Sequence, residues 1–152
     1  MGEGNLVEIV FSRLQTVSNY AVIGSNATAI HLDRAADLKL PLEIIAAEDP
    51  QIQHVVASSM NPLESLFAEA IRAAAEEKKI QYEGIDYRIM TAKPEHLIAI
   101  DLALRGRIAT QAFELIRARK MSDPEEVRCL LKVRHNYDEL YGILTQAIYE
   151  FR

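Results

Sequence analysis

The chain has 152 residues, of which 49% are hydrophobic, and its formal net charge is -5 at pH 7. A chain of this length and composition can bury a core of its own, so we expect a single domain over residues 1–152. The acidic balance argues against general nucleic-acid binding, which usually needs a basic surplus. No apolar run is long enough to span a bilayer, and the first residues lack the pattern of a secretory signal, so we expect a cytoplasmic protein without a membrane partner.

The first third of the chain predicts two helices and three strands. Apolar residues recur at helical spacing from Asn5 to Val17, and a buried strand follows over 20–23. Gly24-Ser25 then turns the chain into a helix over NATAIHL, for which Ser25 or Asn26 can supply the cap. Two further strands are expected over 40–46 and 51–57, and their short link through Asp49-Pro50 predicts an antiparallel pair.

The remaining elements are mostly helical. The stretch NPLESLFAEAIRAAAEEKK (61–79) begins with a cap and a proline and predicts a helix, and a strand follows over 85–90. A helix that is apolar nearly all round starts at Pro94, so Leu97, Ile98 and Ile100 should be buried. One helix is expected over 108–120 and one long helix from Ser122 or Asp123 to the end. Together these elements predict an α+β fold with a small mixed sheet, a core over about residues 1–120 and a C-terminal helix over 121–152.

Cys129 is the one cysteine of the chain. A single thiol allows neither an intramolecular disulfide nor a thiolate metal cluster. Its neighbours, VRCLLKV, belong to an apolar helical stripe, so we expect Cys129 to be a small buried hydrophobic residue.

Two stretches and the order of elements resemble the nucleotidyltransferase fold, in the branch that includes bacterial toxin–antitoxin and abortive-infection proteins. The stretch YAVIGSNATAIHLDR (20–34) is similar to that family's strand, Gly-Gly or Gly-Ser turn, small-residue helix and closing Arg. The stretch GIDYRIMTAKPEHLIAIDLALRGR (84–107) is similar to its strand and Pro-Glu-x-Leu-Ile helix. The resemblance implies phosphate binding by Gly24, Ser25 and Arg34. A plain N-cap is the competing interpretation of Ser25.

The chain departs from this family at the positions that carry the chemistry. In the family, an Asp-x-Asp on the second strand and a third Asp on a neighbouring strand hold magnesium. Counted from Arg34, the first two positions fall at Leu38 and Leu40, or in the other register at Asp37 and Lys39. The third falls nearest His54, and the lysine that is often found on the Pro-Glu-x-Leu-Ile helix corresponds to Asp101. Because the carboxylate set is incomplete, we expect no metal site of the family's kind.

Three carboxylates remain as candidates for a rearranged acid set. Asp37 and Glu43 are the candidate catalytic residues, with help from Asp101. The competing interpretation is structural: Asp37 begins a strand or caps a turn, and Glu43 faces solvent. Asp101 then pairs with Arg105 or Arg107, because a buried charge needs a partner. The four histidines share no metal-binding spacing.

Two hypotheses for function follow. The favoured one is a nucleotidyltransferase-like protein without catalysis that acts as a binding or interaction module in a bacterial two-component system of the toxin–antitoxin type. It needs no cofactor, and its partner is another protein or a second copy of the chain. The alternative is an active, divergent nucleotidyltransferase that uses ATP or another nucleoside triphosphate with magnesium.

Overall fold

The computed structural model describes residues 3–16, 19–34, 38, 43–46, 57–58 and 69–150. The chain divides into two compact units, Met1–Lys93 and Pro94–Arg152, called here the N-terminal and C-terminal units. The boundary between them directly precedes the helix that the sequence predicts from Pro94. The single domain over 1–152, with a division near residue 120, stays a prediction.

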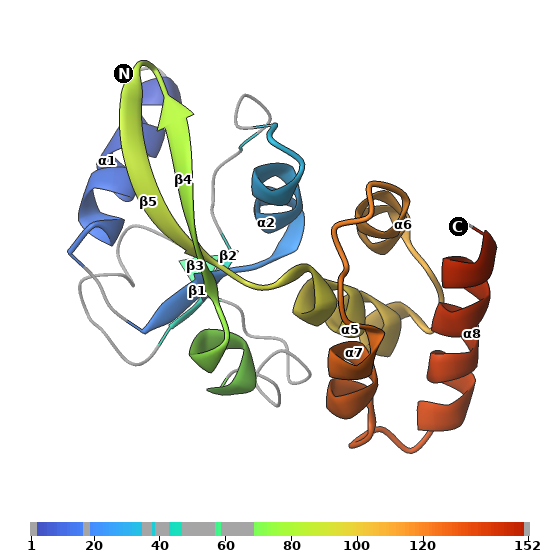
Figure 1. Ribbon diagram of the computed structural model, residues 1–152. Coiled ribbons are helices and arrows are strands. Elements are labelled where there is room, and N and C mark those ends of the chain that lie inside the picture. The colour runs from blue at the N-terminus through green and yellow to red at the C-terminus, as the bar shows by residue number, and fades with distance from the viewer. Residues whose placement is uncertain are drawn as a thin grey trace. The chain divides into compact units, whose positions relative to one another are not determined.

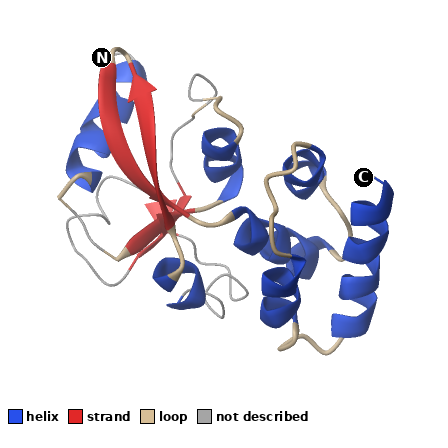
Figure 2. Ribbon diagram, in the orientation of Figure 1, coloured by secondary structure: helices blue, strands red, loops and turns tan. Residues whose placement is uncertain are grey.

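The N-terminal unit contains a five-stranded mixed sheet (Figures 1 and 2). The strands lie in the order β3-β2-β1-β5-β4, and β1 is antiparallel to β2 and parallel to β5. Their bounds are β1 Tyr20–Val22, β2 Glu43–Ala46, β3 Ala57–Ser58, β4 Glu76–Tyr82 and β5 Ile85–Thr91. The structure therefore confirms an α+β fold with a mixed sheet, in which the short apolar strand β1 is central and fully buried.

Helix α1 (Glu3–Leu14) contacts β5 in the N-terminal unit. Its side chains Val10, Phe11 and Leu14 are buried, and the Phe11 ring lies 5.2 Å from the Tyr87 ring between centroids. Beyond the end of α1, the side-chain amide of Gln15 donates to the carbonyl of Arg88 at 2.9 Å and accepts from its backbone N–H at 3.0 Å. The side chain of Gln15 therefore binds both backbone polar groups of Arg88 and links the end of α1 to β5.

The hairpin of β4 and β5 corrects one predicted helix. The helix expected over 61–79 begins outside the described residues. Within them, residues 69–73 are helical and the segment from Glu76 is a strand. The turn residues Glu83 and Gly84 have φ of 53° and 79°, as in the two-residue turns that match the twist of paired strands. Pairing with β5 along seven residues therefore prevails over the helix propensity of Glu and Lys, which is worth only tenths of a kcal/mol per residue.

The pairing of β2 and β3 corrects the predicted orientation of these strands. They are neighbours, as expected, but they are parallel, with Glu43 opposite Ala57. The antiparallel prediction assumed a link of a few residues at Asp49-Pro50. Parallel neighbours cannot be joined by such a tight turn, because the chain must first return to the end of the sheet at which the first strand began. The predicted strand positions 40–42 and 51–56 lie outside the described residues.

Over its described residues, 94–150, the C-terminal unit has helices and no strands. It contains α5 (Pro94–Arg105), α6 (Thr110–Arg117), α7 (Pro124–Leu131) and α8 (Tyr137–Glu150). Helix α5 contacts α6 and α7, and α8 contacts the same two helices. Leu97, Ile98 and Ile100 are 5%, 0% and 7% exposed, which confirms the burial predicted for α5.

The C-terminal end is helical, as expected, but it is two helices instead of one. Asp123 caps α7 by accepting from the backbone N–H of Glu125 at 3.1 Å, and Pro124 is its first residue. The helix ends at Leu131, and α8 begins at Tyr137. The bend lets α8 pack back on α7, where the Arg128 Nε donates to the Tyr137 hydroxyl at 2.6 Å.

Cys129 is exposed, so the prediction that it is buried was wrong. The buried residues of α7 are Val127 and Leu131, four positions apart on one face. Cys129 lies midway between them, which turns its side chain to the opposite face of the helix.

No helix among the described residues is long and apolar enough to cross a membrane.

Candidate functional site

The strand β1, the turn at Gly24 and the helix α2 (Gly24–His31) form the site that the sequence predicts for phosphate. Gly24 has a φ of 74°, a conformation that a residue with a Cβ adopts only with strain. The turn takes the chain from the buried strand β1 directly into α2, whose residues Ala27 and Ala29 are small and buried. The left-handed backbone conformation of this turn therefore accounts for a glycine at position 24.

The start of α2 differs from the predicted capping arrangement. Its N-cap is Ile23, in extended conformation, and no side chain accepts a hydrogen bond there. Ser25 is the second helical residue and is exposed, while Asn26 is the third and is 5% exposed. Neither residue acts as the cap. Backbone amides at such a helix start attract anions through their N–H groups and the helix dipole.

Arg34 lies at the other end of the same helix. Its backbone N–H donates to the carbonyl of Ala29 at 2.8 Å, and the preceding Asp33 has a φ of 57°. This is a Schellman ending, in which a left-handed residue stops the helix and the next amide reaches back to its last turn. Since α2 has eight residues, it separates the backbone of Arg34 from the amides at Ser25 by about 12 Å. Of the three candidate phosphate-binding residues, Gly24 and Ser25 therefore lie at the start of α2, whereas Arg34 lies beyond its other end.

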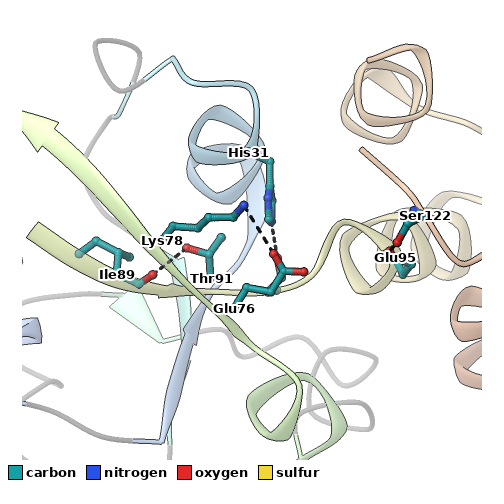
Figure 3. A network of polar contacts seen from close by, with 8 residues as sticks. His31, Glu76, Lys78, Ile89, Thr91, Glu95 and Ser122 are labelled. Carbon is teal, nitrogen blue, oxygen red and sulfur yellow. Dashed lines mark hydrogen bonds and ion pairs between the residues drawn. The ribbon is translucent and has the colours of Figure 1, made fainter. Parts of the chain in front are cut away.

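His31 anchors the end of α2 to the sheet. Its Nε2 is 2.7 Å from the carbonyl oxygen of Ala92, directly after β5, and its side chain is 4% exposed. Figure 3 shows His31 together with Glu76 and Lys78 of β4, whose carboxylate and ammonium groups are 3.5 Å apart, and with the buried Thr91. The Ala92 amide donates to the carbonyl of Val22, which fixes β1 beside the same segment. The position of α2 relative to β1 is therefore set at both of its ends.

The positions predicted for the catalytic acids are only partly described. Asp37, Lys39, Leu40 and His54 lie outside the described residues. Leu38 is described and is 8% exposed. Glu43 is the first residue of β2, next to Ile44 and Ile45, which are both buried. Asp37 and Glu43 consequently stay candidates from the sequence.

Asp101 has the ionic partner that the sequence predicts and a second partner that it does not. Its Oδ1 accepts from the Nε of Arg105 at 2.9 Å, which confirms one of the two expected pairs. Its Oδ2 accepts from the backbone N–H of Ala112 at 3.4 Å. Ala112 is in the first turn of α6, whose own N-cap, Ala109, offers no side-chain acceptor. Asp101 thus caps a neighbouring helix, a role that spacing along the chain does not reveal.

Other polar side chains of α5 contact α7 and the loop that precedes it. The Oε1 of Glu95, a residue 3% exposed, accepts from the backbone N–H of Ser122 at 3.3 Å (Figure 3). The Nε2 of His96 is 3.4 Å from a carboxylate oxygen of Glu126. Within the described ranges, no group of three or more His, Cys, Asp or Glu side chains is arranged to hold a metal ion.

The buried hydroxyl of Tyr20 supports the centre of the sheet. It accepts a hydrogen bond from the backbone N–H of Met90 at 3.1 Å. Burial raises the pKa of Tyr20 above its ordinary value and the charge of Glu77 adds to this, while the bond from Met90 acts in the opposite direction. The hydroxyl is therefore a neutral structural group.

No family model, curated protein or solved structure matches this chain.

Proposed function

We propose that the N-terminal unit is a nucleotidyltransferase-like unit without catalysis, and that the protein acts as a binding or interaction module. The order of its elements supports this proposal. The strand β1, the Gly24 turn, α2 and β2 follow one another as in the resembling family, and β3 lies beside β2. Later in the chain, β5 is followed by α5, which begins at Pro94 as the family's Pro-Glu-x-Leu-Ile helix does.

The observation that supports the absence of catalysis is that the side chain of Leu38 is buried. Leu38 is at one of the two positions that alignment from Arg34 gives for the first magnesium ligand. A leucine side chain has no oxygen, and magnesium requires several oxygen ligands in near-octahedral order. Phosphoryl transfer without that ion leaves the charge of the transition state unbalanced. A buried leucine instead belongs to the core of the unit.

The setting of this module is part of the proposal. We infer a cytoplasmic protein, and the resemblance supports a role as one component of a bacterial two-gene system of the toxin–antitoxin type. Its partner is then a protein, either the product of the neighbouring gene or a second copy of the chain. Binding to such a partner requires neither a nucleotide nor a metal.

Titration of the protein with ATP and magnesium tests the proposal. We expect magnesium to leave the melting temperature nearly unchanged, both alone and in the presence of ATP, because a ligand stabilises only the state that it binds. An assay for released pyrophosphate should show no magnesium-dependent turnover. Binding of ATP without magnesium, at the amides that start α2, is compatible with the proposal, since these donors need no carboxylate.

Magnesium-dependent turnover would overturn the proposal if it disappears in Asp37→Ala or Glu43→Ala. The matched control is Asp86→Ala, which removes an exposed carboxylate from β5. Loss of turnover in the first two variants and its retention in the control would identify the protein as a divergent nucleotidyltransferase.

A further inference from the structure

The C-terminal unit has an open groove between α6 and α8, with a volume of about 530 Å³. Its apolar lining includes Ile108 before α6, Phe113 on α6 and Ile143 on α8. Phe113 is 36% exposed although it is a large aromatic residue. The groove therefore presents apolar surface to the outside of the unit, as binding surfaces for proteins often do.

Gly142 lies in the lining of the groove and in the interior of α8. A glycine inside a helix destabilises it by about 1 kcal/mol relative to alanine. A Cβ built at Gly142 would meet no atom within 4 Å, and the residue has no positive φ, so neither crowding nor backbone strain within the chain requires glycine here. The missing side chain deepens the groove and lets another backbone approach α8 closely, as small residues do where helices pack tightly.

Among the residues that the structure describes, the charged side chains that line the groove are both acidic. Glu139 and Glu150 lie eleven positions apart on α8, about 16 Å along the helix, near its two ends. Helix α8 also carries Asp138 and has no basic residue. A partner that covers the apolar lining therefore brings its end groups close to two carboxylates, which favours positive charge at both ends.

We propose that this groove binds an amphipathic, basic helix of a partner protein. Its apolar stripe would cover Ile108, Phe113 and Ile143, with a small side chain or backbone against Gly142. Its Lys or Arg residues, about three turns apart, would face Glu139 and Glu150. A helix fits because the groove lies between two helices, which present side-chain ridges for ridges-into-grooves packing. The part of the C-terminal unit that the structure describes has no strand that could offer backbone hydrogen bonds to a bound peptide.

This inference goes beyond the proposed function, because it concerns the C-terminal unit and a ligand without phosphate. The two proposals can fail separately. Turnover of ATP would leave the groove proposal intact, and absence of helix binding would leave the proposed loss of catalysis intact.

The test uses the full chain and a fluorescent synthetic peptide of about 15 residues, or four helical turns. The peptide has Leu at positions i, i+3, i+4 and i+7 and Arg about three turns apart. Two control peptides have the same composition in shuffled order, or Glu in place of each Arg. We expect saturable binding of the first peptide by fluorescence anisotropy, with an affinity at least tenfold higher than that of either control.

Protein variants locate the binding on the groove. Gly142→Leu fills the space at the groove floor and should abolish binding, while its circular dichroism stays helical, since leucine is the better helix former. Glu139→Lys combined with Glu150→Lys should weaken binding at least tenfold and reduce its dependence on salt. The matched control is Asp138→Lys, which reverses a neighbouring charge that does not line the groove and should leave the affinity within twofold of the unmodified protein.

Three results would overturn the proposal. One is the absence of saturable binding by the basic helical peptide, and another is unchanged binding by a folded Gly142→Leu protein. The third is a concentration-dependent increase in mass by sedimentation that Gly142→Leu abolishes, because the groove would then be occupied by a second copy of this chain.

Discussion

Asp101 lies on an almost wholly buried helix, and its carboxylate contacts both Arg105 on its own helix and the first turn of α6. The two contacts contribute differently to stability. The Arg105 side chain is 54% exposed, so solvent screens the ion pair and reduces its contribution. The bond to the amide of Ala112 is buried and satisfies a group that α6 cannot satisfy itself.

Replacement of Asp101 separates these contributions. We expect Asp101→Ala to lower the free energy of unfolding by about 1–3 kcal/mol, because it removes the acceptor for α6. Asp101→Asn keeps an oxygen acceptor and removes the charge, so its loss should be under about 1 kcal/mol. Chemical denaturation measures both variants. Equal losses would show that the charge, and not the cap, makes the main contribution.

The raised pKa of Tyr20 predicts a dependence of stability on alkaline pH. The folded state favours the neutral hydroxyl of Tyr20, so its stabilisation is complete below the ordinary tyrosine pKa of 10.0. Above that pH the unfolded chain releases the proton first, and the stabilisation is lost as the pH rises. We expect the free energy of unfolding to fall more steeply above this pH in the unmodified protein than in Tyr20→Phe. Urea denaturation at several pH values measures the slopes.

The Tyr20→Phe variant needs a control for general effects of tyrosine. It should also lose about 1 kcal/mol at neutral pH, since the amide of Met90 loses its acceptor. Tyr149 is 77% exposed, so Tyr149→Phe should change neither the neutral stability nor the slope. Parallel slopes for all three proteins above pH 10 would contradict a structural role for the neutral Tyr20 hydroxyl.

At the scale of the elements, two helices end on residues that adopt a left-handed conformation without being glycine. Asp33 follows α2 and Arg119 follows α6, each with a φ of 57°. At both ends the next amide reaches back to the last turn, from Lys120 to Leu115 in α6, at 3.0 Å. The hydrogen bonds at the helix end therefore hold a non-glycine residue in a left-handed backbone conformation that it would otherwise avoid.

Glycine at the end of α6 should relieve this strain. We expect Arg119→Gly to raise the free energy of unfolding by about 0.5–1 kcal/mol. The strain energy that glycine removes from the folded state is larger than the free-energy cost of the greater freedom that it gives the unfolded chain. The adjacent Ala118 has a φ of -78°, so Ala118→Gly gains no relief and should lose a similar amount. Thermal melts compare the two substitutions. A loss of stability in both would mean that Arg119 contributes through its side chain.

At the scale of the whole molecule, the chain consists of an α+β unit and a helical unit. The helices of the C-terminal unit contact one another, and their buried residues include Leu115, Val127, Leu131 and Leu144, each 0% exposed. A unit of this size is near the lower limit for a core that folds without disulfides or metals.

We expect residues 94–152, produced alone, to keep a helical circular dichroism spectrum and a cooperative thermal transition. The full chain provides the reference for helix content. A matched destabilised fragment with Leu131→Ala should melt at lower temperature, because that side chain is fully buried. A spectrum of unfolded chain for the fragment would show that the C-terminal unit depends on the rest of the protein.

The sequence alone predicted elements whose signals are local. The strands β1 and β5, the helix from Pro94 and a cap of α7 at Ser122 or Asp123 follow from apolar spacing and from residues that start helices. These signals depend on neighbours a few positions away. The glycine turn at Gly24 was predicted for the same reason. For Asp101, the cost of burying a charge predicted a basic partner, with Arg105 and Arg107 as the two candidates.

The tertiary structure decided the features that depend on contacts far apart in the sequence. Strand pairing turned the charged segment EEKK into β4 and made β3 parallel to β2, because ladder hydrogen bonds join residues that local propensity does not relate. The packing of α8 against α6 and α7 set the break before Tyr137, left Cys129 on the outer face of α7 and formed the groove at Gly142. The sequence shows a glycine in the interior of the last helix, but only the arrangement of the helices shows that the space beside it opens outward.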